Sequence, residues 1–252
     1  MACSTADLAA VSLCPELMVQ SRTSTADWLP SSHILDWIFM NAPAVSKQAV
    51  RDAEATKRRI LDAATAEFAG HGYGGARVDQ IAEAARTNKR MLYYYYGSKE
   101  ALFLATLEAA YDHIRAAERE LHLEELSPLQ ALEELVRFTW NYFVRYPEFM
   151  MLLNAENQHR AKHLKKSTQV HTMNSPVIET IGVILKRGEK SKAIRPGIDP
   201  VQLYVSIAGL CYFYLSNVYT LSVAFGRELL SAPAMKERID HVVDFVLAGV
   251  RA

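Results

Sequence analysis

A helical spacing of apolar residues is the feature that most constrains the fold of this chain. From Glu54 onward it continues with few breaks: Ile60, Ala64 and Phe68 recur every three or four residues, and the pattern stops at Gly70. This spacing is typical of an amphipathic helix, and the alternation of Val, Ile and Thr that indicates strands does not occur in the sequence. The sequence therefore predicts an all-α fold.

The composition is that of a globular protein with enough material for a core. Half of the 252 residues are apolar, and 28 basic residues balance 28 acidic ones, which excludes collagen, low-complexity disorder and a small disulfide scaffold. The three cysteines are too few for a disulfide framework, and the first 20 residues lack the basic cluster of a secretory signal. We therefore expect a cytoplasmic protein. No phosphate loop, nucleophile elbow or zinc-protease helix occurs in the sequence, so no cofactor is predicted.

Residues 1–53 differ from the rest of the chain. They are rich in Ser, Thr and Ala, contain Pro15, Pro30 and Pro43, and show no sustained period. We expect them to form an unstructured arm. Because Met40 offers a second start just before the first strong helix, we also hypothesise that residues 1–39 are not translated.

Two short helices are predicted after the first long one. Val78 and Ile81 mark the first of them, and Asn88 is a suitable N-cap for the second, which carries Leu92 inward. Two short helices joined by a turn and preceded by a longer helix form the geometry of a helix-turn-helix DNA reader. The sequence therefore predicts a three-helix unit of this kind over residues 54–104.

The second short helix carries the chemistry of DNA recognition. Four basic side chains and no acid lie in the stretch from Arg86 to Lys99. Leu92 provides the docking side, and Arg90 lies opposite, where arginine can donate to guanine O6 and N7, while Met91 can contact a thymine methyl group. Tyrosine hydroxyls and the ammonium of Lys99 can reach phosphates. The predicted DNA-contacting residues are Arg77, Asn88, Lys89, Arg90, Met91, Tyr93, Tyr94, Tyr95 and Lys99.

The stretch from Lys57 to Leu104 resembles the N-terminal domain of TetR-family transcriptional regulators. The residues that carry the resemblance are Ile60-Leu61-Asp62-Ala63-Ala64, Phe68, Gly72-Tyr73, Ile81-Ala82, Leu92-Tyr93-Tyr94-Tyr95-Tyr96 and Gly97-Ser98-Lys99-Glu100-Ala101-Leu102-Phe103. The resemblance implies that residues 105–252 form a larger helical effector-binding and dimerisation domain. It also implies a homodimeric transcriptional regulator that binds a near-palindromic operator, with repression as the expected mode of action. A small-molecule effector is expected to act on it by a population shift.

Two positions depart from the pattern of that family. Arg86 stands in a turn where the family often has glycine, and a left-handed backbone there would strain it. Arg77 stands at the cap of the first short helix, where the family has Thr or Ser, and its charge can replace a hydroxyl–phosphate contact. These departures bear on base contacts and half-site sequence rather than on DNA binding itself.

The segment Pro200–Gly226 contains no charged residue. Its length suffices for a membrane span, but Gln202 and Asn217 are among several polar residues spread through it, and a helix that is apolar all round is also typical of a buried position. The resemblance implies that two long helices, about Pro200–Phe225 and Met235–Val250, pack against their copies in a second subunit as a four-helix bundle. We favour this bundle and expect no membrane partner. The apolar side of the second helix consists of Val242, Val243, Val246, Leu247 and Val250.

Aromatic residues crowd two stretches, Phe138–Phe149 and Tyr204–Phe225. If the two helices face each other, some of the rings would line a cavity for a flat or greasy ligand, with a few polar groups to orient it. The alternative is that the rings only fill the core and an interface. The predicted effector is apolar or aromatic, and the predicted ligand-contacting residues are Trp140, Phe143, Asn154, His159, Tyr212 and Asn217.

A competing function class is a helical metal-dependent enzyme. Glu156, His159 and His163 stand at positions i, i+3 and i+7, a spacing that would allow a metal to be held on one helix face. Because no fourth ligand is in view, we predict surface histidines, no metal site and no enzymatic activity.

Overall fold

The computed structural model describes residues 47–252 of the chain. Residues 1–46 of the expected arm, with the alternative start at Met40, lie outside the described residues. The described part consists of helices and connecting turns, with one antiparallel bridge between Ile194 and Arg251 and no strand. The all-α prediction is therefore confirmed for this part of the chain.

Three helices form the N-terminal part, which we call the head: α2 (Lys47–Gly75), α3 (Val78–Ala84) and α4 (Lys89–Tyr96). Their apolar residues converge on one core, because Ile60, Phe68, Ile81 and Leu92 are all fully buried. The two short helices predicted from the sequence are therefore present, and Ile81 of α3 and Leu92 of α4 lie in the same core as the apolar residues of α2.

The first helix is longer than its sequence pattern indicated. It begins at Lys47, so the expectation of an unstructured arm is wrong for residues 47–53. Those residues have good intrinsic helix propensity and contain neither glycine nor proline, which allows the amphipathic helix to extend toward the N-terminus. The helical geometry breaks at Gly72, whose φ of 65° favours glycine.

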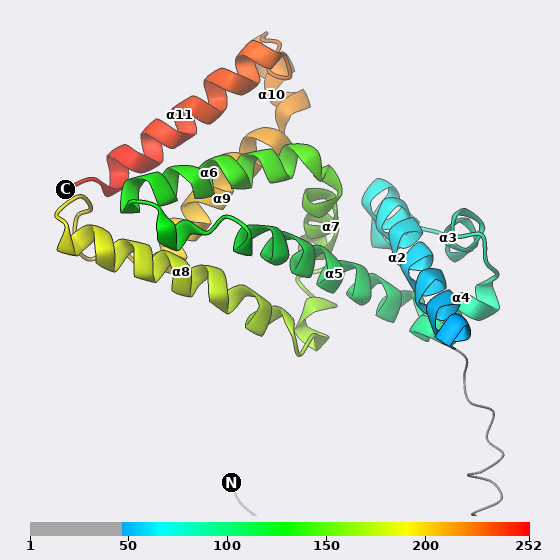
Figure 1. Ribbon diagram of the computed structural model, residues 1–252. Helices are drawn as coiled ribbons and strands as arrows, with labels where there is room; N and C mark the ends of the chain where they lie inside the picture. The colour runs from blue at the N-terminus through cyan, green and yellow to red at the C-terminus, as the bar shows by residue number, and fades with distance from the viewer. Residues whose placement is uncertain (1–46) are drawn as a thin grey trace, which may run out of the picture. The chain divides into compact units, whose positions relative to one another are not determined.

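Helix α5 joins the head to the rest of the chain. α5 (Lys99–Arg119) begins beside the head and runs on into the larger part of the molecule (Figure 1). Leu102 and Phe103 belong to the core of the head, whereas Ile114 belongs to the second, larger core. The boundary expected after Leu104 thus lies inside one continuous helix, so the two parts are linked by a rigid element rather than by a flexible loop.

The remaining elements form the larger part, which we call the body. Arg187 of α8 (Val170–Lys190) donates to the carbonyl of Leu126, the residue after η1 (Leu123–Glu125). Leu152 and Ala155 of α7 (Pro147–Gln158) pack into the core of the head. The elements of the body are η1 (Leu123–Glu125), α6 (Pro128–Arg145), α7 (Pro147–Gln158), η2 (Leu164–Lys166), α8 (Val170–Lys190), α9 (Pro200–Ser216), α10 (Val218–Phe225) and α11 (Ala232–Val250).

The uncharged segment forms two helices where the sequence predicted one. α9 ends at Ser216 and α10 begins at Val218, with a bend of 69° between them. At the break, the Asn217 side chain donates to the carbonyl of Phe213, which caps the end of α9. Among the described residues, no single helix is long and apolar enough to cross a membrane.

The last helix matches its prediction closely. α11 begins at Ala232, three residues before the expected start, and the Ser231 side chain accepts from the N–H of Ala234. All five residues of the predicted apolar side are buried: Val242, Val243, Val246, Leu247 and Val250.

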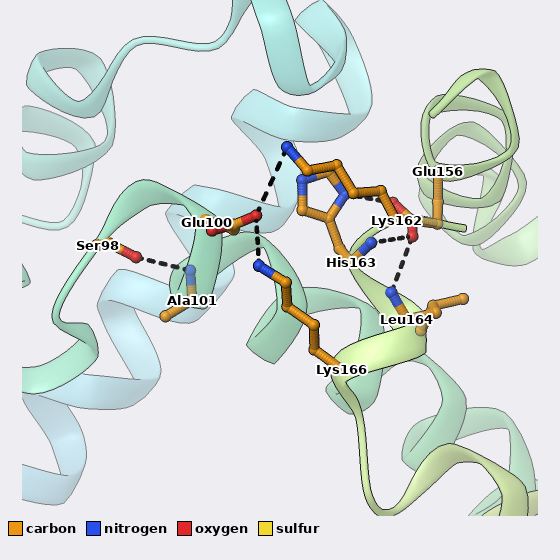
Figure 2. Close-up of polar contacts among 8 residues, drawn as sticks. All are labelled: Ser98, Glu100, Ala101, Glu156, Lys162, His163, Leu164 and Lys166. Carbon is orange, nitrogen blue, oxygen red and sulfur yellow. Dashed lines mark hydrogen bonds and ion pairs between the residues drawn. The ribbon is translucent and has the colours of Figure 1, made fainter. Parts of the chain in front are cut away.

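A buried carboxylate fixes the loop that follows α7. Glu156 is only 1% exposed, and its Oε1 accepts from the backbone N–H groups of His163 at 2.7 Å and Leu164 at 2.9 Å (Figure 2). Its Oε2 lies 2.6 Å from Nδ1 of His163. The Glu156 side chain thus bonds to the backbone and ring of His163 and to the backbone of Leu164. These bonds hold the loop against the end of α7.

The loop held in this way contacts both the start of α5 and the head. Nζ of Lys166 lies 2.9 Å from Oε1 of Glu100 at the start of α5, and Nζ of Lys162 lies 3.8 Å from the same oxygen (Figure 2). The hydrogen bond from Lys166 lowers the pKa of the Glu100 carboxyl. The His163 ring packs at 4.5 Å from the Tyr73 ring of α2. Head and body are therefore joined at this loop as well as through α5.

We expect Glu156→Ala to be strongly destabilising. A buried donor left without an acceptor costs about 1–3 kcal/mol, and this change removes the acceptor of several donors at once. We predict that the free energy of unfolding in urea, measured at fixed protein concentration, falls by about 3 kcal/mol. Glu179→Ala, which removes a carboxylate from an exposed position on α8, is the control and should cost less than about 0.5 kcal/mol. Equal losses for the two variants would contradict this role of Glu156.

Candidate nucleic-acid interface

The second short helix of the head is held rigidly at both ends. The Asn88 side chain accepts from the N–H of Met91 at 2.9 Å, as the sequence predicted for an N-cap. Gly97 closes the C-terminus with a φ of 75°, and the Ser98 side chain then accepts from the N–H of Ala101 at the start of α5. With Leu92 completely buried beneath it, α4 has little freedom to rotate or slide.

The opposite side of α4 is open to solvent. Arg90 is exposed, and its guanidinium makes no hydrogen bond or ion pair with any of the residues that the structure describes. Tyr94, one turn further along, is 77% exposed, and Tyr93 is 43% exposed. Met91 is half-buried. The prediction that a basic, tyrosine-rich side faces outward therefore agrees with the geometry.

Two of the predicted contact residues have partners inside the head. The ammonium of Lys89 forms an ion pair with the Asp79 carboxylate of α3, and both side chains are about half exposed. Nζ of Lys99 donates to the carbonyl of Ala76 at 2.7 Å and lies 5.0 Å from the centre of the Tyr73 ring. In this conformation Lys99 is bound to the turn after α2, so its predicted phosphate contact stays a prediction.

The two tyrosines at the end of α4 pack toward α2. Nζ of Lys57 lies 5.9 Å from the ring centre of Tyr95, and the Tyr96 hydroxyl donates to the backbone carbonyl of Lys57 at 3.0 Å. Tyr96 was not among the predicted DNA contacts, and no anchoring role was predicted for it. The row of four tyrosines gave no signal to separate the exposed ring of Tyr94 from the anchoring hydroxyl of Tyr96.

The turns around α3 accommodate both departures from the family pattern. Arg86 adopts a left-handed backbone with a φ of 52°, as expected for a position that favours glycine, and its N–H donates to the carbonyl of Glu83. Arg77 is the N-cap residue of α3, where its N–H donates to Oε1 of Glu67 at 2.8 Å. Its guanidinium is free of partners among the described residues. Glu67 thus stabilises this turn, a role that was not predicted from the sequence.

Only part of the predicted ligand set is brought together. The Tyr212 hydroxyl donates to Oδ1 of Asn154, Nδ2 of Asn154 donates to Ser216, and the rings of Phe143 and Tyr212 lie 6.5 Å apart. Trp140 is buried against the Tyr214 ring, and Asn217 lies at the break between α9 and α10. His159 is exposed at the loop after α7, with its ring 5.5 Å from that of Tyr73. The ligand assignment stays a prediction.

The three residues of the metal alternative serve other purposes. Glu156 is already bonded to the backbone and ring of His163, and His159 is turned to the surface. The expectation of surface histidines is wrong for His163, which is fully buried, because the Glu156 carboxylate draws it into the junction with the head. In the described part of the chain, the group with metal-ligand spacing is instead the exposed set His122, Glu124 and Glu125.

Comparison with known proteins assigns both parts of the chain. Residues 60–106 match the family described as bacterial regulatory proteins, tetR family, and residues 128–246 match the family described as tetracyclin repressor-like, C-terminal domain. These two stretches contain, respectively, most of the head with the start of α5, and most of the body.

The relatives cover most of the chain. The HTH-type transcriptional repressor NicS of Pseudomonas putida is 38% identical over 201 residues, which span 80% of this chain and 95% of NicS. The HTH-type transcriptional repressor SCO4008 of Streptomyces coelicolor is 60% identical over 60 residues, or 24% of this chain and 31% of that protein. A TetR family transcription regulator from Marinobacter aquaeolei has the same fold, with a TM-score of 0.60 at 21% identity over 80% of this chain and 97% of the other.

The matched families consist of transcriptional regulators, and this evidence sets aside the metal-dependent enzyme. The two family matches and the 38% identity to NicS show that this chain belongs to the tetR family of bacterial regulatory proteins.

Proposed function

We propose that this protein is a ligand-responsive repressor that binds a near-palindromic operator as a homodimer. The observation that carries the proposal is the exposed guanidinium of Arg90, held without a partner among the described residues on a helix that its caps and Leu92 keep rigid. The name of NicS, a transcriptional repressor, supports repression rather than activation. The cytoplasm, where the DNA lies, is the expected place of action.

In this proposal α4 enters the major groove and reads base edges. Arg90 donates to guanine, while Lys89, Met91 and Tyr94 contact neighbouring bases once DNA competes with Asp79 for the Lys89 ammonium. Arg77, Tyr93, Tyr95 and Lys99 lie around the helix, from which they position the head on phosphates. Asn88 acts through its cap, since the cap fixes the register of α4.

The homodimer of the proposal forms through the last helices of the body. Large apolar side chains are exposed along this part, and an apolar patch of this kind is typical of an interface between subunits. Phe245 of α11 is 60% exposed although α11 buries five other apolar residues. The exposed members of the patch are Val201, Val205, Phe213, Tyr219, Val223, Phe225, Leu230 and Phe245.

A small apolar or aromatic effector would act on the head through two connections. α5 is continuous from head to body, and the loop held by Glu156 contacts Glu100 and Tyr73. An effector that binds one arrangement of the body more tightly therefore shifts the population toward the head spacing that goes with it. DNA is released when that spacing no longer matches successive major grooves.

We predict that Arg90→Ala weakens binding to the promoter DNA of the protein's own gene by about 1–3 kcal/mol and reduces its preference over random DNA. Fluorescence anisotropy at fixed salt, with the two DNA fragments of equal length, measures both effects. Arg145→Ala, which removes an exposed arginine of α6, should leave both affinities unchanged. A uniform loss on the two DNA fragments, or no loss, would show that Arg90 does not read bases.

The dimer is tested by placing a charge within the apolar patch. Phe245→Glu should shift the protein from dimer toward monomer in sedimentation velocity at micromolar concentration, because a buried unpaired carboxylate would oppose association. Val183→Glu makes the same kind of change on an exposed position of α8 and should remain dimeric. A Phe245→Glu protein that sediments as a dimer would place the interface elsewhere.

A further inference from the structure

A cavity lies where the head meets the body. Its volume is about 330 Å³, which is within the range of small-molecule sites. Part of its wall comes from α2 of the head, and the rest comes from α5 and from the corner where α6 ends and α7 begins. None of the ligand-contacting residues predicted from the sequence lines this cavity. Its polar and aromatic lining consists mainly of Asp62, His113, Tyr142, Tyr146, Glu148 and Phe149.

Three aromatic rings of the lining lie close together. The ring centres of Tyr142 and Tyr146 are 4.8 Å apart, and those of Tyr142 and Phe149 are 5.8 Å apart. The face of an aromatic ring attracts a cation. Arg145, which does not line the cavity, already places its guanidinium 5.4 Å from the centre of the Tyr146 ring. The rings therefore suit a ligand that is flat and positively charged.

Two carboxylates at the cavity form no hydrogen bond. Asp62 of α2 and Glu148 of α7 are exposed, and neither has a hydrogen bond or an ion pair with any residue that the structure describes. Other polar groups of the lining are bonded, since the Tyr142 hydroxyl lies 2.7 Å from Nδ1 of His113, and the Thr65 hydroxyl donates to a carbonyl of its own helix. The described lining contains no lysine or arginine that would neutralise the two carboxylates.

We propose that this cavity binds a small organic cation that carries an aromatic ring, such as an aryl amidine or an arylalkylamine. The N–H groups of the cation donate to the carboxylates of Asp62 and Glu148 in charge-assisted hydrogen bonds. Its ring packs against the aromatic side chains of the lining. A neutral or anionic ligand of the same shape gains less, because it leaves the two carboxylates without a positive partner.

An occupant of this cavity contacts the head and the body at once. Asp62 follows Ile60, a core residue of the head, along α2. Glu148 lies in the first turn of α7, the helix whose Leu152 packs into the same core. A cation bonded to both carboxylates therefore favours one arrangement of α2 against α7. Its effect on DNA binding rests on the proposed function, whereas the binding site itself does not.

Isothermal titration of the full chain in phosphate buffer tests the site with three probes of nearly the same shape. Benzamidine is positively charged, benzamide is neutral and benzoate is negatively charged. We expect benzamidine to bind about tenfold more tightly than benzamide, since an ion pair and a cation–ring contact each add a modest gain at a partly exposed site. Benzoate should not bind. No binding of benzamidine, equal binding of benzamide, or tighter binding of benzoate would overturn the proposal.

Matched variants locate the binding site. The double variant Asp62→Asn, Glu148→Gln keeps the shape of both side chains and should reduce the affinity for benzamidine to that for benzamide, with an unchanged circular dichroism spectrum. Glu134→Gln removes an exposed carboxylate of α6 that does not line the cavity and should bind benzamidine like the unmodified protein. Full binding by the double variant, or an equal loss in Glu134→Gln, would contradict the assignment of this cavity.

Fluorescence anisotropy with the promoter DNA of the protein's own gene measures the effect on the head. Saturating benzamidine should change the DNA affinity of the unmodified protein and leave that of the double variant unchanged. An unchanged affinity in the unmodified protein would overturn the role of the cavity as an effector site. A protein that binds benzamidine but no DNA would contradict the proposed function and leave the cation site standing.

Discussion

The buried carboxylate of Glu156 is the contact on which the joining of the two parts depends. It satisfies the N–H groups of His163 and Leu164, so the loop after α7 lies against Tyr73 and Glu100 of the DNA-reading side rather than in solvent. Because α7 itself completes the core of the head with Leu152 and Ala155, a displacement of α7 cannot leave the head unmoved. In the proposed regulator, the effect of effector binding in the body would reach the head through these packed contacts.

Helix α5 also contributes to the interior of both parts. Its first half carries Leu102 and Phe103 into the core of the head, and its second half carries Arg115 and Glu118 into the interior of the body. One helix is therefore fixed in the core of the head at its start and buried in the body at its end. Among the four predicted DNA-contacting cations, Lys89 is paired with Asp79 and Lys99 is bonded to Ala76, whereas Arg77 and Arg90 are free of partners among the described residues. Of these two, Arg90 is the one that lies on α4.

Local rules made much of the head predictable. The Asn88 cap and the buried Leu92 follow from residue type and spacing within one or two turns. The left-handed backbone at Arg86 was predicted only from the resemblance to a family that often has glycine there. The bend at Asn217 was missed because an uncharged, continuous segment carries no signal for a break that a side-chain cap creates. Glu156 and His163 were considered as metal ligands because they were expected to share one helix face. In the structure α7 ends at Gln158, and the chain turns back so that the two side chains bond to each other. The burial of Arg115 was missed because an arginine in a helix is ordinarily solvated.

The claim at the centre of this account is that α4 lies in the major groove, once per subunit. Dimethyl sulfate methylates guanine N7 in that groove, so methylation interference on the promoter DNA of the protein's own gene measures the contact directly. We predict two symmetric blocks of interfering guanines, separated by a whole number of helical turns of about 10 base pairs each, with the strongest guanine in each block lost for the Arg90→Ala protein. A single block, or interference confined to adenine N3 in the minor groove, would contradict the account.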